Sequence, residues 1–137
     1  NDRIMRILYE NRKNINKFKN EEILEEKAIC SAALTAIMGY EKYYKYHSTY
    51  PENGNRVFVF RSPNSNYDLE KCYIDGNRII WGVKKAKGIN EGRWRNDPRD
   101  EKLFYKLEGD KVIINEIYPD GSKSEWSYSL KYLKRMI

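Results

Sequence analysis

The chain has 137 residues, of which 40% are hydrophobic, 14% aromatic and 34% charged. This length fits one domain with a single core, and the hydrophobic and aromatic content favours a folded chain over a disordered one. No apolar run reaches the roughly 18 residues of a membrane span. The formal net charge of +6 suits an acidic partner, an anionic membrane surface or a nucleic-acid backbone, or serves solubility alone.

The first segment is basic and weakly amphipathic. The chain opens with Asn1 rather than methionine, so we expect that an upstream leader or anchor was removed. Residues 3–18 have helical spacing, and Asn11 interrupts their apolar stripe. We expect residues 1–19 to form a basic helical arm that either docks one thin stripe or binds a partner. The stripe consists of Ile4, Leu8, Ile15 and Phe18.

A second helix is predicted over residues 20–38. Asn20 is a good N-cap because its side chain can accept hydrogen bonds from the free amides of the first turn. Residues 28–38 are almost all small or apolar, which predicts burial on more than one side. Gly39 suits the left-handed residue that follows a helix.

A tyrosine-rich segment over residues 40–50 follows and either extends the helix or forms an extended arm. Residues 51–55 have the composition of a loop. Alternation of apolar and polar residues then predicts six strands. Their ranges are 56–60, 67–74, 78–83, 102–107, 111–118 and 122–130.

Three turn signals separate these strands. Asp75-Gly76 predicts a type I′ hairpin turn, and Gly109-Asp110 predicts a type II′ turn. Pro119-Asp120-Gly121 predicts a type I turn closed by a glycine bulge. Consecutive hairpins build an antiparallel meander, which needs a cover for its buried face. The predicted class is therefore α+β, with N-terminal helices packed on a curled antiparallel meander of five to six strands. Residues 20–137 form one domain, with the sheet over about 56–130.

Two cysteines are present, Cys30 on the predicted helix and Cys72 on a predicted strand. We favour a disulfide between them over two buried free thiols. Closing a loop of this length stabilises the fold by roughly 4 kcal/mol in the chain-entropy estimate. Such a bond persists in an oxidising compartment. We therefore expect a periplasmic or secreted protein, with a cytoplasmic one as the alternative.

No pattern predicts catalysis, metal binding or a cofactor. His47 is the only histidine, and its neighbours include neither an activated nucleophile nor a second ligand. Asp97, Asp100 and Glu101 lie among arginines, so we expect ion pairs there rather than a cation site. The glycines form no phosphate-binding motif. We expect a protein that is not an enzyme.

Binding of another macromolecule is the function that we expect, as an inhibitor, an immunity-type protein or a secretion accessory of the bacterial cell envelope. Interfaces favour tyrosine, tryptophan and arginine, and the long connection over residues 84–98 resembles a binding loop on a rigid scaffold. One alternative is single-stranded nucleic-acid binding through interleaved basic and aromatic residues. Another is a lipid or small ligand held inside a curled sheet. The predicted contact residues are Tyr43, Tyr44, Tyr46, Lys84, Lys85, Lys87, Arg93, Trp94 and Arg95.

Overall fold

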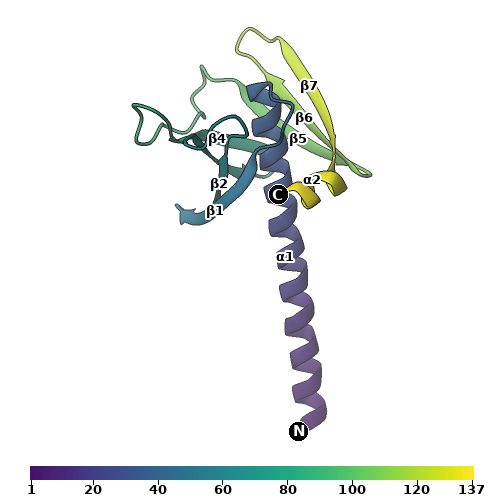
Figure 1. Ribbon diagram of the computed structural model, residues 1–137. Coiled ribbons are helices and arrows are strands. Elements are labelled where there is room, and N and C mark those ends of the chain that lie inside the picture. The colour runs from purple at the N-terminus through teal and green to yellow at the C-terminus, as the bar shows by residue number, and fades with distance from the viewer.

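One long helix and a seven-stranded antiparallel sheet dominate the computed structural model, which describes all residues 1–137 (Figure 1). The strands pair in chain order, as a meander does. The predicted α+β class and curled sheet are confirmed, but the sheet has seven strands rather than five or six. The elements are α1 (Asp2–Met38), β1 (Lys45–Glu52), β2 (Asn55–Arg61), β3 (Leu69–Asp75), β4 (Arg78–Lys85), β5 (Lys102–Glu108), β6 (Lys111–Ile117), β7 (Lys123–Ser129) and α2 (Leu130–Met136).

Helix α1 is continuous, so the predicted helix start at Asn20 is wrong. The N-cap is Asn1, whose Oδ1 accepts hydrogen bonds from the amides of Arg3 at 2.8 Å and Ile4 at 3.3 Å. No glycine or proline interrupts the following 37 residues, and an asparagine inside a helix costs only about 0.7 kcal/mol. Gly39 ends the helix at φ 70°, as predicted.

The two halves of α1 lie in different surroundings. Residues 28–36 are all buried, and they fill the concave side of the sheet. Residues 1–22 are all exposed and project from the domain over roughly 30 Å (Figure 1). The second half of α1 therefore forms the centre of the core, and its first half is an exposed helix.

The tyrosine segment forms part of an additional strand, β1, which pairs with β2 through a tight turn. The predicted loop over residues 51–55 is therefore wrong. Asn53 and Gly54 have φ of 50° and 78°, as the two central residues of a type I′ turn require. Pro51 is tolerated because β1 is an edge strand.

Two of the three predicted turns are confirmed. Gly109 has φ 59°, as the first central residue of a type II′ turn requires. Gly121 has φ 87°, and its amide donates to the Tyr118 carbonyl at 2.9 Å. The type I′ turn at Asp75-Gly76 is wrong: Asp75 pairs with Arg78 in the ladder, so Gly76 and Asn77 occupy the turn.

The sheet bends sharply between β4 and β5, where the ladder has only two residue pairs. Strands β1–β4 and β5–β7 therefore lie on different sides of α1, and α2 packs alongside the helix (Figure 1). Helix α2 was not predicted. Its N-cap is Ser129, and Asp110 of the β5–β6 turn accepts hydrogen bonds from the Ser129 hydroxyl at 2.6 Å and the Lys131 amide at 2.9 Å.

A disulfide joins α1 to β3. The sulfurs of Cys30 and Cys72 lie 2.08 Å apart, and the two Cα atoms lie 6.0 Å apart. Both residues are fully buried in the core. The predicted pairing is confirmed, and it fixes the inner half of α1 to the middle of the sheet.

Candidate functional site

The three tyrosines predicted to contact a partner pack against the domain itself. Tyr44 is only 1% exposed. Its backbone is held by two helix hydroxyls: the Ser31 hydroxyl donates to the Tyr44 carbonyl at 2.7 Å, and Thr35 Oγ1 accepts from the Tyr44 amide at 3.1 Å. Tyr43 and Tyr46 are half-buried.

Trp94 folds back onto the outer face of the sheet. Its ring packs edge-on against Tyr73, with 4.8 Å between the ring centroids, and the Lys71 ammonium lies 4.2 Å from its ring centre. The indole Nε1 donates to the Glu52 carboxylate at 2.6 Å. These contacts make Trp94 a cover for β1 and β3.

The backbone of the connection over residues 86–101 is fastened to β4. The Gly92 amide donates to the Val83 carbonyl, and the Arg95 amide donates to the Trp81 carbonyl, both at 2.8 Å. Gly82 lies directly beneath, where a Cβ atom would come within 2.6 Å of the Arg93 carbonyl oxygen. Sequence reasoning missed this close approach, although an isolated glycine within a strand is its usual signal.

Carboxylates neutralise most of the positive charge on this connection. Asp100 accepts two hydrogen bonds from the Arg93 guanidinium, at 2.6 and 2.8 Å, and Glu101 pairs with Arg95 at 3.0 Å. Hydrogen bonding to Arg93 holds the pKa of Asp100 well below its usual range. The expected ion pairs are therefore present, and no cluster of ligands could hold a metal ion.

Lysines 84, 85 and 87 differ in their surroundings. Lys84 pairs with Glu91 at 3.2 Å, and the buried Lys71 donates to the same carboxylate at 3.1 Å. Hydrogen bonds from these two lysines lower the pKa of Glu91, the Lys71 bond most. Lys85 and Lys87 are exposed.

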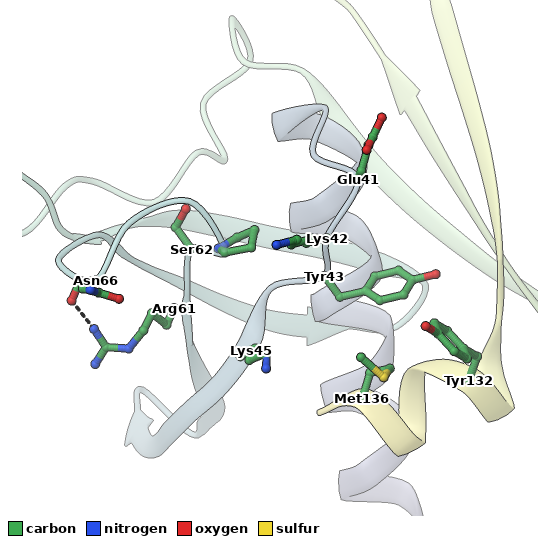
Figure 2. A pocket seen from close by; sticks show the side chains of 10 residues that line it. Glu41, Lys42, Tyr43, Lys45, Arg61, Ser62, Asn66, Tyr132 and Met136 are labelled. Carbon is green, nitrogen blue, oxygen red and sulfur yellow. Dashed lines mark hydrogen bonds between the residues drawn. The ribbon is translucent and has the colours of Figure 1, made fainter.

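A surface cleft of about 550 Å³ lies between the start of β1, the β2–β3 loop and α2. Figure 2 shows Tyr43 and Tyr132 on one side of it and Arg61 with Asn66 on the other. The Arg61 guanidinium donates to the Asn66 carbonyl. Tyr43 and Tyr132 pack together with their ring centroids 5.6 Å apart. The cleft is therefore lined by both aromatic and charged side chains, and Arg61, its most buried cation, already has a hydrogen-bond partner.

Glu70 is a buried carboxyl on the inner face of β3, beside Tyr44. It is 7% exposed, and its Oε2 has no hydrogen-bond partner. Burial, followed by the nearby charge of Asp68, raises the pKa of Glu70 to about 7. Burial also raises the pKa of the Tyr44 phenol. The Tyr44 phenol lies beside the Glu70 carboxyl and the Ser62 hydroxyl, at the edge of the core cluster to which Tyr44 belongs.

The exposed half of α1 carries seven of the thirteen large hydrophobic side chains that are exposed. We call Ile4, Leu8, Asn11, Ile15 and Phe18 the α1 stripe. Its four apolar side chains are exposed by 56%, 46%, 64% and 68% in that order. Monomeric proteins rarely leave such side chains contiguous and uncovered unless they bind something. The sequence disclosed this stripe, but only the structure shows that nothing in the chain covers it.

Searches of protein-family models, curated proteins and solved structures found no match to this chain. None of its helices combines the length and the apolar character needed to cross a membrane.

Proposed function

We propose that this protein is a non-enzymatic binding module, secreted or held at the bacterial cell envelope, that docks a protein partner along the α1 stripe. The observation that supports the proposal is the stripe itself, which lies on a continuous helix and has no intramolecular cover. Exposed apolar surface of this kind is typical of protein interfaces.

The energetics favour docking at a helix that is already formed. Burying one large apolar side chain contributes roughly 1.5–3 kcal/mol before the costs of association. Most of the stability of a helix in a protein comes from tertiary packing, and here the continuation of the exposed segment is anchored in the core by the disulfide. Little ordering of this chain is then required when a partner binds.

The disulfide supports the proposed address. Cys30 and Cys72 are both fully buried and lie at bonding distance. Structural disulfides form and persist in exported proteins and are rare in reducing compartments.

Binding through the Trp94 connection is the second candidate, with single-stranded nucleic acid as its ligand. The exposed side chains of Lys85, Lys87 and Arg99 favour it. Removal of Lys85 and Lys87 should abolish retardation of single strands at low salt, because phosphate contacts dominate such affinity. The two lysines suit this test better than Trp94, whose loss would also disturb the packing on Tyr73. No retardation of RNA or DNA by the unaltered protein would contradict this candidate.

The size of the native complex tests the main proposal. In extracts of cells that produce the protein, we expect the chain to elute with a partner, well above its own 16.4 kDa. Leu8→Ser with Ile15→Ser should return it to the monomer position. Tyr9→Ser is the control, since this side chain is 63% exposed and lies off the stripe and its flanks. Elution of both variants with an unchanged complex would contradict the proposal.

A further inference from the structure

We infer that the partner of the α1 stripe is an amphipathic helix with acidic residues along its flanks. This inference rests on the proposed function and names the chemistry of the partner. Three observations support it: the spacing of the stripe, the position of the sheet around the second half of α1, and the charges beside the stripe.

The stripe has the spacing of a helix–helix seam. Its five positions advance in alternating steps of four and three residues, which keeps them on one narrow line along the helix. The same steps continue through Glu22 and Glu25 to Ile29, Ala32 and Ala36. Those last three are at most 4% exposed, because the chain's own sheet covers them. The seam is therefore covered at its inner end and uncovered at its outer end.

The position of the sheet disfavours a lipid surface. Glu26, one turn beyond Glu22, forms an ion pair with Arg56 of β2 at 2.5 Å. From here onward the sheet lies around α1 on more than one side, the side of the stripe included, since residues 28–36 are all buried. A flat bilayer that follows the stripe towards Glu22 would meet the sheet, whereas a helix about 10 Å wide can lie along the stripe and end there.

The flanking charges disfavour a second copy of this chain. Arg12 and Lys19 border the stripe at equivalent positions one heptad apart. In a parallel pair of copies they would face Ile7 and Asn14, and Glu26 would face Glu21, so no opposite charges would meet. In an antiparallel pair that overlaps the two stripes, Arg12 would face Arg12 and Lys19 would face Met5, so again no opposite charges would meet.

A partner helix with acidic flanks would supply opposite charges for Arg12 and Lys19. Between Arg3 and Lys19 the chain carries six cationic side chains and one carboxylate, Glu10. Glutamates on the flanks of a partner would pair with Arg12 and Lys19 while its apolar seam covers the stripe. Asn11, the one polar residue of the stripe, favours a polar group opposite it and so fixes the register of the pair.

Two synthetic heptad-repeat peptides test the inference. They share one isoleucine and leucine seam, and their flanking positions are all glutamate in one and all lysine in the other. We expect the full chain to bind the labelled glutamate peptide at least about tenfold more tightly at low salt, measured by fluorescence anisotropy, with a smaller difference at high salt. Arg12→Glu with Lys19→Glu should reverse the preference, and Arg6→Glu with Lys13→Glu, on the opposite face, should leave it in place.

Equal affinity for the two peptides, or binding of neither, would overturn the inference. So would a dimer of the purified chain in light scattering, or sedimentation with phosphatidylglycerol vesicles that the stripe variant Leu8→Ser with Ile15→Ser abolishes. If the stripe variant breaks the native complex while the peptides are not distinguished, the proposed function stands and the helical partner fails. If the native complex survives the stripe variant, the proposed function fails.

Discussion

At the scale of single residues, Glu70 is the side chain whose environment conflicts most with its usual ionisation. It lies in the core next to Tyr44, and burial raises its pKa from 4.5 to about 7. Because the pKa of the folded state lies above that of the unfolded state, the stabilising contribution is complete below pH 4.5. It is lost as the pH rises through 7.

Glu70→Gln should therefore stabilise the protein at alkaline pH. Glutamine keeps the size of the side chain and cannot ionise. We expect the free energy of unfolding to rise by about 1–2 kcal/mol at pH 8, with the gain shrinking towards pH 5. Urea denaturation at each pH measures it, and Glu125→Gln on the exposed face of β7 is the control. A gain that is independent of pH, or that grows on acidification, would be incompatible with a buried, neutral Glu70.

Gly82→Ala should loosen the Trp94 connection without disturbing α1. The added methyl group would lie 2.6 Å from the Arg93 carbonyl oxygen, so the connection or the strand must shift. We expect a loss of about 1–3 kcal/mol in stability. Amide exchange at Gly92 and Arg95 should become faster than in the exposed β7 control Ser127→Ala. Unchanged exchange at these two amides would show that the connection is not fastened in this way.

At the scale of elements, the disulfide and the tight turns hold the fold. Cys30 and Cys72 close a separation of 42 residues. Cys30→Ala with Cys72→Ala should lower the free energy of unfolding by up to roughly 4 kcal/mol. Reduction of the wild type should cause a comparable loss. Two alkylatable thiols in native protein, detected by intact mass, would contradict the bonded pair.

Element prediction succeeded where the signal was local. Gly109 and Gly121 occupy the turns that their neighbours imply, and Gly39 ends α1. The β1–β2 hairpin was missed although Asn53-Gly54 is a strong local signal, because the adjacent Pro51 made the segment resemble a loop. Helix α2 was missed because its start depends on Asp110, which lies 21 residues before Lys131.

For the candidate sites too, the sequence discloses local features but not contacts between residues far apart in the chain. The α1 stripe is visible in the sequence because its period is that of a helix, whereas its lack of cover is a property of the tertiary structure. Trp94 was expected at a surface because an isolated tryptophan and its arginines resemble an interface. Its partner Glu52 lies 42 residues away, so no local pattern could disclose the contact.

At the scale of the whole molecule, the protein is a folded domain from which one half of a long helix projects. The sheet, the disulfide and α2 immobilise the second half of α1, and the first half projects into solvent (Figure 1). In the proposed function, this anchoring presents the α1 stripe to a partner as a helix that is already formed.

A photo-cross-linking scan along α1 tests directly whether a partner docks along the stripe. A photoreactive residue would replace each position from 3 to 19 in turn, in cells that produce the protein, and the yield of the protein–protein adduct would be measured. We expect maxima at Ile4, Leu8, Asn11, Ile15 and Phe18, with minima at Arg6, Lys13 and Lys17 on the opposite face. A flat profile, or maxima on the basic face, would contradict docking along the stripe.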